Sequence, residues 1–186
     1  PALELSPHLK NLFSQVDNVD QKRAGSASLY VVGSQSRSGL KSVPVSVIMM
    51  DEVAEFFEEN IPLAMARVDG QDDKTIWMVS TPTVEGFGIS PYFARTNKQL
   101  FFFKCPSCSQ QIELKFPESL IITADDPLDP RINDSYLICY KCKQKLPHEA
   151  KPDFLSTGEW QETESNRDAS GFSISQLYST TQPPGI

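Results

Sequence analysis

Two Cys-x-x-Cys motifs constrain the fold of this chain more than any other feature. Cys105 and Cys108 form the first motif, and Cys139 and Cys142 form the second. Each follows a short run of strand-forming residues, so each is expected at the tip of a β-hairpin. A two-residue gap lets one turn direct two thiolates at the same ion, and four thiolates complete a tetrahedral zinc site. The sequence therefore predicts a four-cysteine zinc ribbon whose metal is structural, because no coordination position stays open for a substrate.

The residues around the cysteines leave several points open. Residues 109–138 separate the two motifs, which exceeds the roughly 15–20 residues of a simple ribbon and predicts an insertion. His148 lies near the second motif and is a spare ligand candidate, although four cysteines suffice. A redox role is disfavoured, since it needs a solitary reactive motif. Four lysines cluster at the metal end: Lys104, Lys141, Lys143 and Lys145. Three roles stay open for them, namely stabilising the thiolates, contacting a phosphate backbone, and making the surface soluble.

A second feature is an apolar run that ends abruptly in two acids. Residues 47–50 are Val-Ile-Met-Met, and Asp51 and Glu52 follow them. A short continuous apolar run predicts a strand of a parallel sheet, buried on both faces. Open α/β sheets bind ligands at the carboxyl ends of such strands. There Asp51 could hold Mg²⁺ through oxygen, and Glu52 could orient or deprotonate a water that attacks phosphorus. The alternative is a core strand that runs into an acidic helix start.

Hydroxyl and basic side chains occur near the ends of two neighbouring predicted strands, at 28–33 and 75–80. The Ser/Gly-rich residues 33–44 are expected to form a loop, in which Arg37 and Lys41 either contact phosphates or are merely solvated. Ser80, Thr81 and Thr83 follow the second strand and are expected to hydrogen-bond across to Glu52. The alternative for these three is a Ser-Thr-Pro turn that ends the strand.

Other segments give simpler expectations. A helix is predicted within residues 2–16, beginning near Ser6-Pro7, and another over residues 55–66. Residues 17–25, 118–134 and 159–168 are expected to be turns or surface loops. Ile112, Leu114 and Phe116 alternate and are expected to share one face of a strand. Residues 172–177 predict a strand that runs into a helix start.

Length and charge exclude some classes of protein. The 186 residues fit one domain, or one domain with a small insert. A net charge of −7 argues against a protein whose whole surface binds nucleic acid, but leaves room for a local basic patch. No apolar run approaches the roughly 20 residues that span a bilayer, and no signal peptide is visible. Paired cysteines that favour metal over disulfides suit a reducing cytoplasm.

Taken in order, several motifs resemble one family. GSQSRSGLKSVPVSVIMMDEVAEF, STPTVEGFGI, KCPSC, YLICYKC and GFSISQLYS together resemble the large terminase subunit of tailed bacteriophages, of the GpA type, over roughly residues 28–180. The resemblance implies a DNA-packaging motor that hydrolyses ATP to translocate duplex DNA into a procapsid. It also implies an α/β fold, namely a partial P-loop NTPase sheet of the RecA/helicase-like kind with an inserted four-cysteine zinc-ribbon β-hairpin module.

The resemblance assigns roles to particular residues. Asp51 becomes the Walker B acid for Mg²⁺ and ATP, and Glu52 the catalytic glutamate. Ser80, Thr81 and Thr83 fall in the coupling motif, and the four cysteines form the zinc-ribbon insertion. The chain departs from the family pattern in two places. Lys41 stands where the family often has Arg. Ser109 and Lys143 stand where a Gly usually follows the second Cys, which is expected to strain both turns.

The resemblance also implies an organisation and a setting. Residues 1–98 are expected to belong to the ATPase domain, 99–146 to the zinc ribbon, and 147–186 to a return to the ATPase domain with a C-terminal segment. No Gly-x-x-x-x-Gly-Lys-Ser/Thr loop occurs in these 186 residues, so we expect a fragment that is inactive alone. The implied partners are duplex DNA, the small terminase subunit, the portal and procapsid, and further copies of the chain, in the host cytoplasm and without a membrane. Two alternatives stay open: a non-enzymatic zinc-ribbon module that binds nucleic acid or protein, and a DEAD-like helicase fragment.

Overall fold

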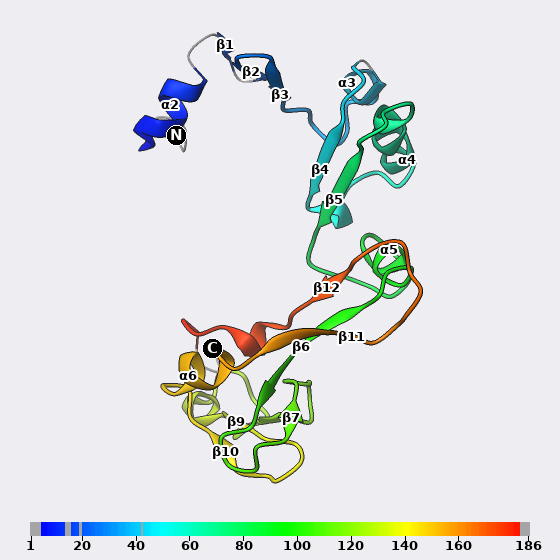
Figure 1. Ribbon diagram of the computed structural model, residues 1–186. Helices are drawn as coiled ribbons and strands as arrows, with labels where there is room; N and C mark the ends of the chain where they lie inside the picture. Colours follow the sequence, from blue (N-terminus) through cyan, green and yellow to red (C-terminus); the bar gives the residue numbers. More distant parts are fainter. Residues whose placement is uncertain (1–4, 14–15, 19, 42, 183–186) are drawn as a thin grey trace. The chain divides into compact units, whose positions relative to one another are not determined.

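The computed structural model describes residues 5–13, 16–18, 20–41 and 43–182 (Figure 1). The chain divides into two compact units, Pro1–Pro91 and Tyr92–Ile186. Among the described residues, no helix combines the length and apolarity that crossing a membrane requires. The first unit contains α2 (Pro7–Leu12), β1 (Val16–Asp17), β2 (Gln21–Ala24), β3 (Ala27–Tyr30), α3 (Arg37–Lys41), β4 (Val47–Asp51), η1 (Val53–Glu55), α4 (Asn60–Met65), η2 (Ala66–Val68) and β5 (Thr75–Val79). α5 (Ser90–Phe93) spans the boundary between the two units in the sequence.

The start of the first helix agrees with the sequence. Ser6 is the N-cap of α2, its Oγ accepts a hydrogen bond from the Leu9 N–H at 3.4 Å, and Pro7 occupies the first helical position. The helix ends at Leu12, so Val16 belongs to β1 and not to the predicted helical face. The predicted start is confirmed, whereas the predicted end is wrong.

Asp17 and Gln21–Ala24 lie in strands, which corrects the turn predicted over residues 17–25. β2 pairs antiparallel with both β1 and β3, and the Ala24–Ala27 register leaves Gly25 and Ser26 as a two-residue hairpin turn. Gly25 has a φ of 59°, which such turns require and which glycine adopts without a steric penalty. These strands pair through their backbones, so the low apolar content of β2 gave no reason to predict a strand there.

A helix also occupies residues 37–41, within the predicted Ser/Gly-rich loop. α3 begins after Ser36, whose Oγ accepts a hydrogen bond from the Gly39 N–H at 3.3 Å, and it buries Leu40. α4 begins at Asn60, later than predicted, and holds Pro62 in its first turn, where the missing N–H costs no hydrogen bond.

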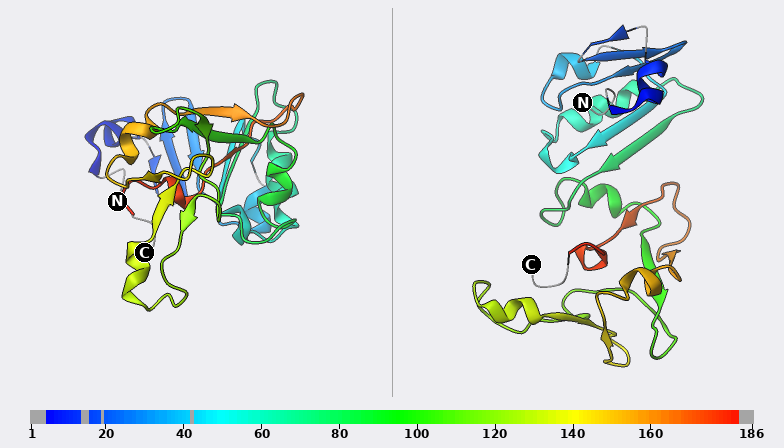
Figure 2. Two further views of the ribbon diagram at one scale, coloured as in Figure 1. Left: turned by 90° about the horizontal axis from the view of Figure 1, so that it is seen from below. Right: turned by 90° about the vertical axis from the view of Figure 1, so that its left-hand side faces the viewer.

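β4 and β5 form a parallel pair, in the register Val47–Thr75 to Asp51–Val79 (Figure 2). Burial alternates along β4: Ile48 and Met50 are buried, while the side chains of Val47 and Met49 are 59% and 71% exposed. The prediction that this strand is buried on both faces is therefore wrong for the described residues. α3 and α4 contact each other and lie on one side of the two strands, so the described helices cover one face of this strand pair (Figures 1 and 2).

The second unit is organised around β6. It contains β6 (Gln99–Lys104), β7 (Gln111–Ile112), β8 (Leu120–Ile121), η3 (Pro130–Asp134), β9 (Tyr136–Ile138), β10 (Lys145–Leu146), α6 (Lys151–Leu155), β11 (Glu159–Glu162), β12 (Phe172–Ser173) and η4 (Gln176–Tyr178). β11 pairs antiparallel with one edge of β6, and β12 pairs parallel with the other edge (Figure 1). β7 forms an antiparallel hairpin with the last residues of β6. A second small sheet has the order β10-β9-β8.

The core of this unit corrects two further predictions. Ile112 and Leu114 are buried as expected, but β7 ends at Ile112, so the alternation does not extend to Phe116, which is 67% exposed. Residues 159–162 form β11 and not a surface loop. Trp160 explains this, because its ring packs edge-on against Phe101 and Phe172, with centroids 5.3 and 5.1 Å apart. The predicted loop at 118–134 holds β8 and η3, and the predicted strand and helix start at 172–177 are confirmed.

Two buried polar side chains attach the C-terminal segment to this core. The Tyr178 hydroxyl donates to the Phe101 carbonyl at 2.6 Å and accepts from the Leu114 N–H at 2.8 Å. Burial raises the pKa of Tyr178 to about 12. Lys151 Nζ donates to the carbonyls of Leu177 and Ser179 at 3.0 and 2.6 Å, and burial lowers the pKa of Lys151.

Candidate functional site

The two cysteine turns have the same backbone geometry. Cys105 N–H donates to the Gln110 carbonyl, and Cys139 N–H donates to the Gln144 carbonyl, both at 3.0 Å. The first turn joins β6 to β7, and the second joins β9 to β10. Each pair of cysteines is thus at the tip of a hairpin, as predicted from the spacing.

The residue after the second Cys adopts a left-handed conformation in both turns. Ser109 and Lys143 have φ values of 56° and 62°, and each donates its N–H to the carbonyl of the first Cys of its turn at 2.8 Å. Glycine adopts this conformation readily, whereas a residue with a Cβ does so at a cost. The turns keep the geometry for which glycine is usual, although the sequence supplies Ser and Lys.

The four cysteines converge on one point. Their Sγ atoms all lie within 4.8 Å of one another, and the Cys105 and Cys142 Sγ atoms are 3.9 Å apart. All four are free, so none forms a disulfide. Ligands about 2.3 Å from a tetrahedral zinc ion lie roughly 3.8 Å from each other. The arrangement therefore fits one Zn²⁺ held by Cys105, Cys108, Cys139 and Cys142.

Burial and hydrogen bonds act differently on two of the thiols. Burial raises the pKa of Cys105 to about 12. Burial also opposes ionisation of Cys139, but backbone N–H groups of Cys142 and Lys141 donate to its sulfur and bring the pKa below its ordinary value. At neutral pH the Cys105 thiol is therefore protonated unless a metal displaces its proton, so metal binding and thiol ionisation are linked.

His148 does not join this cluster. Among the described residues, the group close enough to hold one ion consists of the four cysteines alone. The His148 carbonyl instead accepts a hydrogen bond from the Lys151 N–H at 3.0 Å, at the start of α6.

The acid pair lies at the carboxyl end of β4. Asp51 is the last residue of the strand and is opposite Val79, the last residue of β5. Asp51 Oδ1 accepts a hydrogen bond from the Glu52 N–H at 3.1 Å, and both acidic side chains are exposed. Glu52 has a φ of 54° and a ψ of 50°, a left-handed conformation that is uncommon for a residue with a side chain. Such outliers occur disproportionately at functional sites.

The segment after β5 contacts the turn that follows the acid pair. Ser80 Oγ accepts a hydrogen bond from the Ala54 N–H at 3.0 Å. Gly88, with a φ of 58°, approaches Ala54 so closely that a Cβ on it would lie 3.0 Å from the Ala54 Cα. Ser80 thus reaches the backbone next to Glu52 rather than its carboxylate, and Thr81 and Thr83 are exposed beyond it. No sequence motif indicates the contact between Ala54 and Gly88, since neither residue carries a functional group.

The two basic candidates lie at opposite ends of α3. Arg37 is its first residue and Lys41 its last, and both side chains are exposed. Within the part of the chain that the structure describes, no ion pair links either of them to Asp51 or Glu52.

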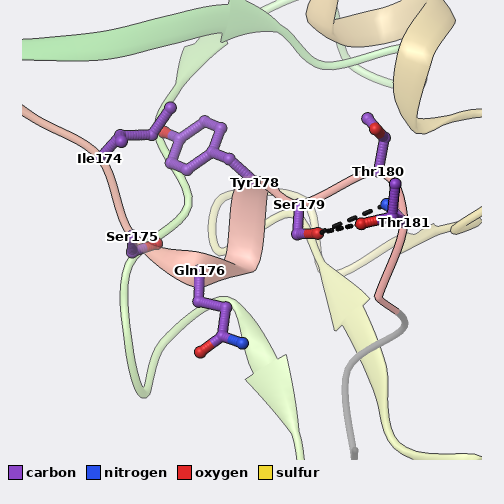
Figure 3. Close-up of a pocket in the computed structure, with 7 residues that line it drawn as sticks. All are labelled: Ile174, Ser175, Gln176, Tyr178, Ser179, Thr180 and Thr181. Atoms are coloured by element: carbon purple, nitrogen blue, oxygen red, sulfur yellow. Dashed lines mark hydrogen bonds between the residues drawn. The ribbon is translucent and has the colours of Figure 1, made fainter. Parts of the chain in front are cut away.

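A shallow pocket lies along the C-terminal segment (Figure 3). Hydroxyl and apolar groups line it, and Ser179 Oγ is 3.2 Å from the Thr181 hydroxyl. Its lining carries no acid, His or Cys, so we assign no chemistry to it: Ile174, Ser175, Gln176, Tyr178, Ser179, Thr180 and Thr181.

Comparison with models of protein families identifies the family of this chain. The family model of the phage terminase large subunit gpA, ATPase domain, matches residues 1–160. The chain belongs to this terminase family. Comparison with curated proteins and with solved structures finds no match.

Membership confirms the family resemblance drawn from the motifs. It gives the chain a role in a phage packaging ATPase in general, with ATP and Mg²⁺ as cofactors and with DNA and the packaging machinery as partners of the family. It also favours a terminase over a DEAD-like helicase. The gpA domain implies a P-loop-like fold, of which the described residues show a mixed α/β arrangement with one parallel strand pair and a four-cysteine cluster.

Proposed function

We propose that this chain works in a motor that hydrolyses ATP to translocate duplex DNA into a procapsid, and that Asp51 and Glu52 act at its nucleotide. One observation carries the assignment: the parallel register of β4 and β5 ends both strands at the same edge, with the acid pair on one and Ser80 on the other. This edge is where open α/β sheets bind ligands.

The two acids take different roles because they differ in backbone position. Asp51 is held by the strand and by the Glu52 N–H, so its carboxylate offers an oxygen ligand of fixed position for Mg²⁺. Glu52 leaves the strand in a left-handed conformation, and its exposed carboxylate is free to accept a proton from water. Bound Mg²⁺ and nucleotide would supply the charge stabilisation and the phosphoryl group.

The segment that follows β5 supports a coupling role through its contact with Ala54. Ser80 holds the turn next to Glu52 by its hydrogen bond to the Ala54 N–H, and Gly88 packs on the same residue. A shift at Glu52 on loss of a phosphate would therefore move residues 80–88. We assign Ser80 the anchoring role in this motif, with Thr81 and Thr83 following it.

The remaining parts of the assignment follow from the family. Arg37 and Lys41 are proposed phosphate contacts. These 186 residues contain no phosphate-binding loop, so they alone should not hydrolyse ATP measurably. The zinc is proposed to brace the second unit rather than to catalyse, since four thiolates fill its coordination shell. The small terminase subunit, the portal and procapsid, and further copies of the chain are the proposed partners.

The test compares two acids in the terminase polypeptide that carries this sequence together with a phosphate-binding loop. Glu52→Gln should lower kcat for ATP by roughly 10²- to 10⁴-fold, as removal of a general base does. Glu58→Gln is the matched control, because Glu58 is also exposed and lies outside the strand end. Unchanged turnover in Glu52→Gln, with the zinc module intact, would refute the motor assignment and leave a zinc-ribbon binding module as the alternative.

A further inference from the structure

The two cysteine turns carry a local excess of positive charge. Residues 104–111 and 139–146 contain four lysines and no Asp or Glu, in a chain whose net charge is −7. We call the four side chains the knuckle surface: Lys104, Lys141, Lys143 and Lys145. Because the four Sγ atoms lie within 4.8 Å of one another, the two turns meet, and the lysines that flank the cysteines gather at one end of the module.

These lysines have no acidic partner among the described residues, and all four are exposed. Lys141 Nζ donates to the Gln111 carbonyl at 2.9 Å, and Lys145 Nζ lies 4.6 Å from the centroid of the Tyr136 ring. Other lysines of the same unit do pair, as Lys98 does with Glu164 at 3.3 Å and Lys115 with Glu113 at 2.9 Å. The absence of acids is therefore a property of the knuckle surface and not of the whole unit.

Neutralising the thiolates does not account for this charge. Four thiolates and one Zn²⁺ carry a net charge of about −2, so two of the four lysines would balance them. Within the described residues no lysine Nζ is hydrogen-bonded to a cysteine sulfur, and the two lysines with contacts of their own direct them to a carbonyl and a ring. The excess positive charge faces solvent beside small neutral donors, namely the exposed Ser107, Ser109 and Gln110.

We propose that the knuckle surface binds the phosphate backbone of duplex DNA. The presence of DNA at this protein rests on the proposed function, but the contact does not depend on ATP hydrolysis. Lysine ammonium groups are point charges that bind phosphate without base recognition, so binding should be independent of sequence and weakened by salt. The zinc ion then has a second effect, because it fixes two lysine-bearing turns side by side.

The experiment measures fluorescence anisotropy of a labelled duplex of about 20 base pairs titrated with the zinc-loaded 186-residue chain at several NaCl concentrations. Each phosphate contact contributes about 0.9 to the slope of log K against log salt, so four contacts predict a slope near −3.6. Lys141→Gln/Lys143→Gln should lower this magnitude by about 1.8. Lys10→Gln/Lys74→Gln is the control with the same charge change, since both of its lysines are exposed in the first unit.

Several results would overturn the inference. The knuckle variant could bind duplex with the slope of the unmodified chain, or the control pair could lower it equally. Loss of zinc from the knuckle variant, measured by metal analysis, would instead show that the lysines stabilise the metal-binding thiolates. Equal competition by polyglutamate and by unlabelled duplex would point to an acidic protein partner. The DNA titration does not involve ATP. A negative result in it therefore does not affect the Glu52→Gln assay, and a negative Glu52→Gln assay does not affect the DNA titration.

Discussion

The cysteine cluster and the acid pair both lie at strand ends, yet they are built in opposite ways. The cysteines come from two hairpins with matching hydrogen bonds, and the fold alone brings their four Sγ atoms within 4.8 Å of one another. Asp51 and Glu52 are adjacent in sequence and exposed, and Asp51 Oδ1 accepts a hydrogen bond from the Glu52 N–H. All four proposed zinc ligands lie within one unit. We propose, in contrast, that the acid pair supplies one part of a site and that a bound nucleotide supplies the rest.

The strands beneath the two sites differ in the same way. β6 has partners on both edges and buries Phe103 fully near its end. β4 has one described partner, β5, and leaves Val47 and Met49 exposed. Rigid surroundings suit a structural metal, and a site that is open on one side suits a reactant that must enter and leave. This contrast can be tested by variants whose expected effects range from large to small.

Removing the metal should give the largest effect, and it should be confined to the second unit. Metal analysis of the reduced protein is expected to give about one zinc per chain, and a chelator should cost the module on the order of 10 kcal/mol of folding free energy. Amide NMR signals of residues 92–182 should collapse, while those of β4 and β5 persist. Cys139→Ser should act in the same direction and Ser107→Ala should not. A fully dispersed spectrum from zinc-free protein would contradict the comparison.

Tyr178→Phe tests the hydrogen bonds that close the second unit. The change leaves the Phe101 carbonyl and the Leu114 N–H buried without their partner, which should cost about 1–3 kcal/mol in chemical denaturation. Because the folded protein keeps the Tyr178 proton up to a pKa of about 12, against 10.0 ordinarily, this stability is complete below pH 10 and is lost as pH rises through 12.

The phenylalanine variant should therefore lose less stability than the unmodified chain when both are moved from about pH 9 to about pH 12. Any contribution from zinc ligation by the four cysteines is common to both proteins and cancels in the difference. An identical alkaline decline in the two proteins would mean that the hydroxyl is not buried as described.

Gly88→Ala tests the contact beneath the acid pair. The left-handed φ of 58° and the approach to Ala54 should together cost about 1–2 kcal/mol, seen in the unfolding of the first unit. Gly86→Ala is the matched control, since Gly86 has a φ of 79° and a Cβ added to it would meet nothing within 4 Å. The two variants share the backbone penalty, so the difference between them reports the Ala54 contact. Equal losses would show that the contact carries no energy.

The sequence predicted those parts of the fold in which residue type and spacing determine the geometry. The cysteine spacing led to the cluster, and Ser6-Pro7 located the start of α2, because ligand number and helix capping are local rules. The acid pair was located at a strand end by the abrupt change from Met50 to Asp51. The roles of Asp51, Glu52, Ser80, Thr81 and Thr83 remain predictions, as do the boundaries at residues 98 and 146.

What the sequence did not predict depends on contacts that residue type alone does not reveal. β2 was missed because a strand rich in polar residues needs backbone pairing and not an apolar pattern. β11 was missed because one aromatic residue, Trp160, outweighs the acids around it by packing on Phe101. The exposed face of β4 was missed because an apolar run does not reveal how many layers will cover it. The Ala54–Gly88 contact joins two residues without functional groups, which no motif would indicate.

Two left-handed residues, one in each region, give the finest test of the comparison. Ser109 and Glu52 have φ values of 56° and 54°, so replacing either by glycine relieves a similar backbone cost, and each variant should gain up to about 1 kcal/mol in stability. The consequences for activity should differ. In the complete terminase, Ser109→Gly should leave ATP turnover unchanged, because its turn serves the metal. Glu52→Gly should lose turnover while gaining stability, since we propose that Glu52 supplies the reacting carboxylate. If Glu52→Gly were instead destabilised by more than Ser109→Gly is stabilised, the side chain of Glu52 would be supporting the fold, and the two sites would be alike in kind.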